Sequence, residues 1–383
     1  MIELPTCFND FLKDIRPTTN HNNDFITGHR TLKKRLLEDE DLSPIIVSTF
    51  LQGSYRRSTA IRPQGDKRAD VDLVVVTTLR REDYTPQEAM DLFVPFMDEH
   101  YKGKWEFQGR SIGIGLSYVD LDLVITSAPS EGEERVLKSA SVMSEDTPET
   151  VDDWRLVPSY VSFSERSLPG AAARLEMAKK EAEWKVSPLH IPDREAEEWD
   201  ETHPLEQIRW TWTKNKACNK HYVNVVKAIK WWRRINHQTP KYPKGYPVEH
   251  LIGQCCPDGI TSIAEGVTRT LETIASSYET YAARKEVPVM PDHGVPAHNV
   301  LHRLTGEDFA AFHAQVSDAA IIARRALDAA NAQASAEEWR KLFGEKFPLP
   351  AKSESSSQEV KVSSATASAG DSGPRPLKDQ PFF

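Results

Sequence analysis

The sequence predicts an α/β domain followed by an all-α domain, with a polar tail at the end. Three observations predict this. Short apolar runs bounded by turn residues, which are typical of buried strands, occur between residues 44 and 125. From about Asp193 to Phe343, apolar residues recur at helical spacing instead. Residues 351–383 are rich in Ser, Ala, Gly and Pro, a composition that buries too little apolar area to fold, so we expect a disordered tail.

The individual elements follow in order along the chain. Helical patterns cover residues 5–15 and 24–37, and another covers residues 88–100. The strand patterns lie at residues 44–51, 71–76, 105–107, 112–116 and 118–125. Residues 129–190 are polar and fit no pattern clearly. Beyond Asp193 we expect no strands, and the helical patterns there cover residues 204–236, 247–256, 261–285, 306–331 and 336–343.

Composition narrows the class of protein. The 383 residues carry a net charge of −9, which argues against stable binding of duplex DNA through bulk charge. The four cysteines form no spaced framework, which favours a reduced, cytoplasmic protein. No apolar run approaches the 18 or so residues of a membrane span, and the first residues do not resemble a secretory signal, so we expect no membrane association.

One constellation of residues points to chemistry. The strand over residues 44–51 leads into Gly53-Ser54, and the next strand opens with Asp70-Val-Asp72. Because strand side chains alternate, the two aspartates share a face, where their repulsion is tolerable if Mg²⁺ binds between them. Gly53 would let a phosphate approach the backbone, and Ser54 would supply a hydroxyl and amides at a helix start.

A third carboxylate is expected on a neighbouring strand. The segment Tyr118-Val-Asp120-Leu-Asp122-Leu-Val-Ile125 offers two on one face. Asp-x-Asp by itself is often a solvated strand edge. Here it lies among apolar strand residues, between an upstream Gly-Ser and a downstream acidic strand, and this order favours a metal site.

This pattern resembles the polymerase-β-like nucleotidyltransferases. More closely, the chain is similar to the bacterial cGAS/DncV-like nucleotidyltransferases, the CD-NTases, and within them to clade D. The resemblance covers most of residues 1–350. It is carried by the segments STFLQGSYRRSTAIRPQGDKRADVDLVVVT, GKWEFQGRSIGIGLSYVDLDLVITSAP, LHIPDREAEEWDETHPLEQIRWT, HYVNVVKAIKWWRRIN, PKYPKGYPVEHLIG and LFGEKFPLP.

The resemblance implies a fold and its boundaries. A polymerase-β-like nucleotidyltransferase core with a long N-terminal helix would occupy residues 1–190. A helical lobe like that of oligoadenylate synthetases would occupy residues 191–347, with the active site between the two. Residues 348–383 would form the disordered tail.

The resemblance also implies residue roles. Asp70, Asp72 and Asp122 would be catalytic and would bind two Mg²⁺ ions, with Asp120 a spare or supporting carboxylate. The nucleotide-binding residues would be Gln52, Gly53, Ser54 and Lys230. Lys230 is chosen because Ile229-Lys-Trp-Trp232 resembles the segment whose lysine holds the donor triphosphate in the family.

The helical pattern around Lys230 has a marked charge division. Between Lys216 and Arg234, helical spacing places one stripe of largely apolar residues, Cys218, Tyr222, Val225, Ile229 and Trp232. The opposite stripe is basic, Lys216, Lys220, Lys227, Lys230 and Arg234. We expect this basic stripe to face outward. It is either plainly solvated or relieved by an anionic partner, because like charges at this spacing repel.

In function, clade-D resemblance implies synthesis of a cyclic trinucleotide, most closely cyclic AMP-AMP-GMP from ATP and GTP, for anti-phage (CBASS) signalling through an effector nuclease. It also implies an E1–E2-like conjugating partner that acts on the C-terminus at Phe383. The alternatives are cyclic tri-AMP synthesis, a same-fold nucleotidyltransferase acting on RNA, a protein or a small molecule, and a catalytically inactive nucleotide sensor. The intact Gly-Ser and Asp-x-Asp argue against the sensor.

Three other patterns are interpreted as structural. Gln108–Gly115 imitates a glycine-rich phosphate loop but lies between strands and lacks Gly-Lys-Ser/Thr, so hairpin glycines are favoured. His298 and His302 have the spacing of zinc ligands without an evident third ligand. His250 with Cys255-Cys256 lacks a fourth ligand, and we interpret the cysteines as buried thiols.

Overall fold

The computed structural model describes residues 1–65, 68–127, 188–236 and 239–350. Residues Met1–Pro350 form one compact unit. The unassigned segment 129–190 lies almost entirely outside the described residues, as do residues 351–383 of the expected tail. The division into a core over 1–190 and a helical lobe over 191–347 stays a prediction.

A five-stranded sheet forms the centre of the first part of the chain. Its order is β1-β2-β5-β4-β3, with β2 and β5 parallel and the other neighbours antiparallel. The predicted strands are confirmed, as β1 (Ile46–Gln52), β2 (Ala69–Thr77), β3 (Trp105–Phe107), β4 (Ile112–Gly115) and β5 (Val119–Thr126). The β-branched and leucine-rich strands β2 and β5 lie in the middle, where both faces are covered.

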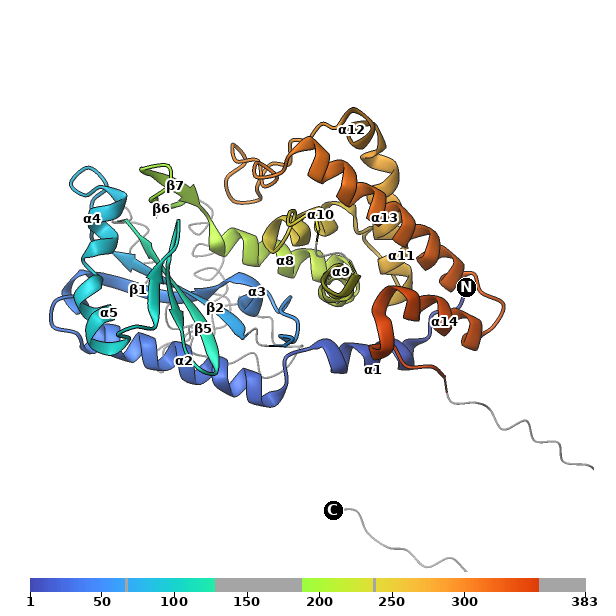
Figure 1. Ribbon diagram of the computed structural model, residues 1–383, viewed down its shortest axis with the longest axis horizontal. Coiled ribbons are helices and arrows are strands. Elements are labelled where there is room, and N and C mark those ends of the chain that lie inside the picture. Colours follow the sequence, from blue (N-terminus) through green and yellow to red (C-terminus); the bar gives the residue numbers. More distant parts are fainter. Residues whose placement is uncertain (66–67, 128–187, 237–238, 351–383) are drawn as a thin grey trace, which may run out of the picture. The chain divides into compact units, whose positions relative to one another are not determined.

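Helices cover one face of this sheet. The long helix α2 (Thr19–Glu38) runs along it and buries Phe25, Leu32 and Leu36 against strand residues such as Leu121 (Figure 1). Thr18 and His21 form the capping box that starts α2. The helix predicted over residues 88–100 is in fact two helices, α4 (Pro86–Asp91) and α5 (Val94–His100), because Pro95 favours the first turn of a new helix.

The other face of the sheet contacts a small hairpin. The strands β6 (Leu189–Asp193) and β7 (Glu198–Thr202) pair antiparallel, and Leu189 and Ile191 pack with Phe50, Val74 and Val124. The expectation of no strands beyond Asp193 is therefore wrong. The β7 sequence, EWDET, is too polar and charged to show an apolar strand pattern, and its pairing with β6 decides its conformation.

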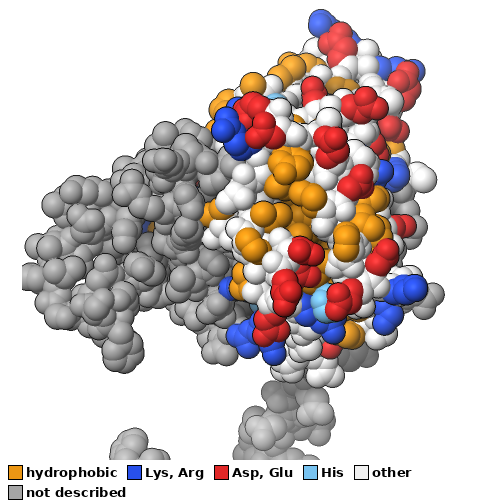
Figure 2. Space-filling model, turned by 90° about the vertical axis from the view of Figure 1, so that its left-hand side faces the viewer, with side chains coloured by type: hydrophobic (Ala, Val, Ile, Leu, Met, Phe, Trp, Pro, Cys, Tyr) orange, Lys and Arg blue, Asp and Glu red, His pale blue; other side chains and the backbone are white. Residues whose placement is uncertain are grey.

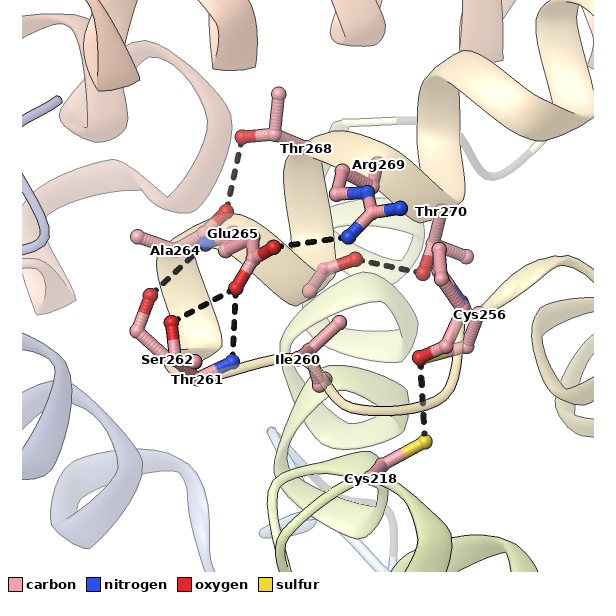
Figure 3. Close-up of polar contacts among 12 residues, drawn as sticks. Cys218, Cys256, Ile260, Thr261, Ser262, Ala264, Glu265, Thr268, Arg269 and Thr270 are labelled. Atoms are coloured by element: carbon pink, nitrogen blue, oxygen red, sulfur yellow. Dashed lines mark hydrogen bonds and ion pairs between the residues drawn. The ribbon is translucent and has the colours of Figure 1, made fainter.

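Beyond β7, the elements of the described chain are helices, as predicted, joined by loops. The long helices are α8 (Pro204–Ala217), α9 (Tyr222–Asn236), α10 (Tyr246–Cys255), α11 (Ile263–Ser277), α13 (Gly306–Leu327) and α14 (Ala332–Phe343), with a short α12 (Glu279–Arg284). The start of α11 shows how polar side chains define these helices (Figure 3). Ser262 accepts from the Glu265 amide, and the Glu265 carboxylate contacts Thr261 and Arg269.

Helix α9 lies at the centre of this helical core. It packs against α8, α10, α11 and α14 and also against α1 (Pro5–Ile15) from the start of the chain. Phe8 and Phe11 of α1 pack in the cluster formed by Trp339, Phe343 and Phe347, with Phe8 edge-on to Trp339 and Phe347 and Phe11 stacked on Phe343. The first helix thus belongs to the helical core in packing, although it precedes the sheet in sequence.

One face of the molecule carries charges of both signs. The face drawn in Figure 2 mixes acidic and basic side chains around exposed apolar ones, and acidic groups are prominent. Within the part of the chain that the structure describes, none of the helices combines the length and apolar character needed to cross a membrane.

Candidate active site

The predicted aspartates lie on the two central, parallel strands. Asp72 of β2 pairs in register with Asp122 of β5, and Asp70 pairs with Asp120. Because side chains alternate along a strand, these aspartates share the face of Val74 and Val124, which is opposite to α2. The parallel register therefore brings together carboxylates that lie 50 residues apart in sequence.

Burial and the proximity of neighbouring carboxylates raise the pKa values of these aspartates. Desolvation together with the neighbouring carboxylates Asp72 and Asp122 raises the pKa of Asp70 to about 8. Desolvation and Asp72 raise the pKa of Asp122 to about 7. Desolvation also raises the pKa of Asp72, although the Arg57 guanidinium acts in the opposite direction. A group of acids in this state favours a divalent cation, whose charge would relieve the repulsion.

The two candidates for the third carboxylate differ in their partners. Asp120 is paired with Arg68, whose Nε lies 2.7 Å from its Oδ1, and its side chain is 42% exposed. Asp122 accepts one hydrogen bond, from Gln108 Nε2 at 3.0 Å, and lies beside Asp72. Both are in register with an acid of the dyad, Asp120 with Asp70 and Asp122 with Asp72, so they differ in their partners: Asp120 is neutralised by an arginine, and Asp122 accepts from an uncharged amide. The catalytic assignment of Asp122 stays a prediction.

The glycine-serine turn is built around Asp72. Gly53 begins the short helix α3 (Gly53–Arg56) with φ +73°, a conformation that favours glycine. A Cβ at this position would overlap the Asp72 carboxylate. Gln52 ends β1 directly opposite Asp72 in the ladder. Gly53 is therefore needed because the Asp72 carboxylate lies against the backbone at this position. The sequence alone predicts a glycine here only so that a substrate phosphate can approach the backbone.

Two cavities are lined in part by these aspartates. The larger, about 670 Å³, is lined by Asp70 and Asp122 together with residues of β3 and β4. The second, about 480 Å³, reaches Asp72 and extends between the β6–β7 hairpin and the helical part, where Tyr242, Tyr246 and Arg303 line it. Both cavities therefore open beside the acids.

The predicted outward basic stripe between Lys216 and Arg234 is wrong. Lys216 belongs to α8, Lys220 lies in the turn before α9, and the two segments are not one helix. Lys227 is only 4% exposed and Lys230 is largely buried, because α9 is surrounded by other helices. Burial lowers the pKa of Lys227 to about 7.

An anion does face Lys230, but it is a side chain of the protein. Lys230 Nζ donates to Glu249 Oε1 at 2.6 Å and to the carbonyl oxygen of Thr59 at 3.0 Å. Burial lowers the pKa of Lys230, and Glu249 partly offsets this. The role of Lys230 toward a nucleotide remains a prediction.

Sequence reasoning missed three polar residues near the site, Arg57, Gln108 and Glu249. Glu249 is the only acid in helix α10 and lies, with His250, between the apolar residues Val248 and Leu251, and such a lone acid was a detectable signal. Gln108 and Arg57 carried no such signal, because their partners Asp122 and Glu249 lie far away in the sequence.

The patterns interpreted as structural have structural contacts. Gln108–Gly115 includes part of the β3–β4 hairpin, and the absence of a side chain at Gly113 makes room for Gln108. His250 stacks on His293 with ring centroids 3.9 Å apart, and all four cysteines are buried thiols. His298 lies 3.3 Å from Asp200. Among the described residues, no group of three or more His, Cys, Asp or Glu side chains is arranged as a ready metal site.

Comparisons with known proteins agree with this geometry. Residues 2–133 match the family model of the Second Messenger Oligonucleotide or Dinucleotide Synthetase domain. The fold resembles Escherichia coli MS115-1 CdnC solved with ATP, with 16% identity, TM-score 0.59, and coverage of 90% of this chain and 98% of that one. It also resembles Bradyrhizobium diazoefficiens CdnG solved with GTP, with 13% identity, TM-score 0.62, and coverage of 88% and 94%.

Relatives in sequence extend over nearly the whole chain. A cyclic AMP-AMP-AMP synthase of Acinetobacter sp. (strain ATCC 27244 / 9458) is 29% identical, over 94% of this chain and 90% of that protein. A cyclic AMP-AMP-GMP synthase of Enterobacter hormaechei subsp. hoffmannii (strain UCI 50) is 51% identical over 355 residues, covering 91% of this chain and 93% of that protein. The chain is therefore a member of the CD-NTase family of nucleotidyltransferases that make second-messenger oligonucleotides.

Proposed function

We propose that this chain joins ATP and GTP into a cyclic trinucleotide, cyclic AMP-AMP-GMP. The observation that carries the proposal is the set of three acids, Asp70, Asp72 and Asp122, brought together by the parallel β2–β5 pair beside two open cavities. The 51% identity to a cyclic AMP-AMP-GMP synthase supports the choice of bases. The more distant cyclic AMP-AMP-AMP synthase keeps cyclic tri-AMP as the alternative product.

In each step, a ribose hydroxyl oxygen forms a bond to the α-phosphorus of a nucleoside triphosphate. The bond from that phosphorus to the bridging oxygen breaks, pyrophosphate leaves, and the hydroxyl proton passes to solvent. We propose that Asp70 and Asp72 position the triphosphate and that Asp122 lies beside the attacking hydroxyl. Gln52, Gly53, Ser54 and Lys230 would contact the nucleotide. Ring closure is the same step within one bound molecule and is favoured by proximity.

We propose that these acids bind two Mg²⁺ ions. Asp70, Asp72 and Asp122 supply the oxygen ligands that Mg²⁺ prefers. Burial raises the pKa of all three, and neighbouring aspartates raise it further at Asp70 and Asp122, so a bound cation would favour the ionised forms. When bound, the ions would neutralise the triphosphate and make the attacking hydroxyl more acidic. We propose that substrate phosphates complete the coordination.

The test is direct. The purified chain is incubated with Mg²⁺ and all four nucleoside triphosphates, one labelled at a time, and the product is treated with phosphatase and analysed by mass. We expect a phosphatase-resistant ring with two adenosines and one guanosine. A ring of three adenosines would select the alternative, and only linear or protein-linked products would contradict cyclic synthesis.

The family supports a role in anti-phage (CBASS) signalling, in which an effector nuclease responds to the product. We also propose that an E1–E2-like partner conjugates the tail at Phe383, which lies outside the described residues. Incubation with the purified partner and ATP would then give an adduct. Deletion of Phe382 and Phe383 should abolish it, whereas an adduct of unchanged yield would refute this assignment.

A further inference from the structure

A carboxylate is buried between the helical core and the segment that follows the glycine-serine turn. Glu249, on α10, has a side chain only 4% exposed. Its Oε1 accepts from Lys230 Nζ at 2.6 Å. Its Oε2 accepts from Thr59 Oγ1 at 2.7 Å and from Arg57 Nε at 3.1 Å. A buried acid with this many charge-assisted bonds is fully compensated.

These bonds connect Lys230 to the turn that carries Ser54. Thr59 donates its backbone N–H to the Ser54 carbonyl at 2.9 Å, and the Thr59 carbonyl accepts from Lys230 at 3.0 Å. Glu249 therefore holds α9 and the residues after α3 in one fixed arrangement. Lys230 comes from α9, Thr59 from the segment after α3, and Glu249 from α10.

The charges in this cluster do not cancel. Lys230 and Arg57 bring two positive charges to the single negative charge of Glu249. Burial alone would raise the pKa of Glu249, but Lys230 and Arg57 lower it to about 2, so it stays ionised. An ammonium has three N–H donors, and Lys230 uses two on Glu249 and Thr59. The third has no partner among the residues that the structure describes.

We propose that Glu249 is a positioning residue for nucleotide binding. It fixes the Lys230 ammonium relative to Ser54, so that the third N–H of Lys230 can donate to a phosphate oxygen without breaking the other two bonds. This inference rests on the proposed function, because it takes the triphosphate as the ligand of Lys230. Lys230 touches the nucleotide, whereas Glu249 acts only through Lys230 and the Thr59 segment.

The experiment is a double-mutant cycle on the full chain. KM for nucleoside triphosphate and kcat are measured for Glu249→Gln, Lys230→Ala and the double variant. Gln keeps the shape of Glu but removes its charge. We expect Glu249→Gln to raise KM about tenfold with kcat changed much less, since a charge-assisted bond is lost. In the Lys230→Ala background, where KM is already raised, Glu249→Gln should add little.

Matched variants separate positioning from loss of structure. Glu265→Gln removes a comparable carboxylate, which accepts from Thr261 and Arg269 at the start of α11, and should leave KM unchanged. Lys230→Arg should restore binding only in part, because a planar fork replaces a compact ammonium. If Glu249→Gln does not fold, Thr59→Val is the substitute variant, because it removes one hydrogen-bond donor to Glu249. It should raise KM a few-fold when Lys230 is present and have little effect in the Lys230→Ala background.

Two results would overturn the inference. One is an unchanged KM in folded Glu249→Gln. The other is an effect of Glu249→Gln that is equally large with and without Lys230, which would assign the acid to stability alone. Failure of the proposed function is a different result, because the unmodified chain would then form no cyclic product from any mixture of triphosphates.

Discussion

At the scale of single residues, the site is governed by repulsion between acids. Asp70, Asp72 and Asp122 occupy neighbouring positions on one face of the sheet. Arg57 is the cation that lowers the pKa of Asp72, and Lys230 acts similarly on Asp70, but the pKa of each acid is still raised. Without a bound cation, the folded chain therefore keeps these carboxylates close together at a cost in stability.

The double substitution Asp70→Asn with Asp72→Asn separates activity from stability. We expect turnover to be abolished, because the acids proposed to hold Mg²⁺ are gone. The free energy of unfolding without metal should stay equal or rise slightly, because the repulsion is removed. Product formation and urea unfolding check the two parts. A double variant that still makes product would refute the metal assignment.

Asp122 and Asp120 can be distinguished in the same way. Asp122→Asn should lower turnover on the order of 10³-fold, by analogy with other lost electrostatic contacts to a reacting group. Asp120→Glu should be tolerated, because its partner Arg68 is partly exposed and can follow the longer side chain. Initial rates under saturating triphosphate measure both. The opposite ranking would show that Asp120, and not Asp122, is the third ligand.

The residues of the site were predictable from sequence to unequal degrees. Asp70, Asp72, Gly53 and the Asp120/Asp122 pair stood out because strand alternation fixes which side chains share a face. Lys230 was singled out by its sequence pattern, and its role toward a nucleotide stays a prediction, but its surroundings were not predicted. A helical pattern tells which residues share a stripe, and it cannot tell that Glu249 and Thr59 will cover that stripe from other elements.

At the scale of elements, strands and helices were predictable wherever apolar periodicity was strong. The sheet strands and most helices from α8 to α14 follow their patterns closely, although the single helix expected from Lys216 to Arg234 is interrupted between α8 and α9. The β6–β7 hairpin and the break between α4 and α5 could not be predicted from apolar periodicity. The polar β7 is held by pairing with β6, and Pro95 starts a second helix within one apolar pattern. Both depend on interactions that periodicity does not record.

The glycine turn between β1 and α3 gives an element-scale prediction. Gly53→Ala should lose activity and stability, because alanine is strained at φ +73° and its Cβ would displace the Asp72 carboxylate. The control is Gly259→Ala, which has the same φ of +73° but nothing within 4 Å of its Cβ. It should lose only about 1 kcal/mol of stability and keep its activity. Equal loss of activity in both would contradict the role of Gly53.

At the scale of the whole molecule, buried histidines should make stability depend on pH. Burial lowers the pKa of His29 and His250 to about 4, and burial with the neighbouring His250 lowers that of His293 to about 3. The unfolded chain takes up these protons near pH 6.5. Their contribution to stability is therefore complete above about pH 6.5 and is lost as the pH falls toward 4.

The substitution His293→Gln tests this dependence. Gln cannot take up a proton, so the variant should lose less stability than the unmodified chain between pH 6.5 and 4.5. The difference in slope should be at most about 1.4 kcal/mol per pH unit. Urea unfolding at several pH values measures it. Parallel pH profiles for the two proteins would exclude His293 as a contributor.

We expect residues 1–350 to be sufficient for synthesis of the cyclic product. Every residue of the proposed site, the Glu249 cluster and both cavities lies within the compact unit Met1–Pro350. Its end is anchored by Phe347, which is fully buried and packs edge-on against Phe8 and at a tilt against Phe11 of α1. A chain ending at Pro350 should therefore fold and make product at a rate within a few-fold of the full chain, because it keeps every residue of the proposed site. Initial rates of cyclic product formation by the two proteins check this. A loss of a hundredfold or more in a truncated protein that melts normally would mean that residues 351–383 contribute to catalysis itself, and the tail would then have to be counted as part of the active site.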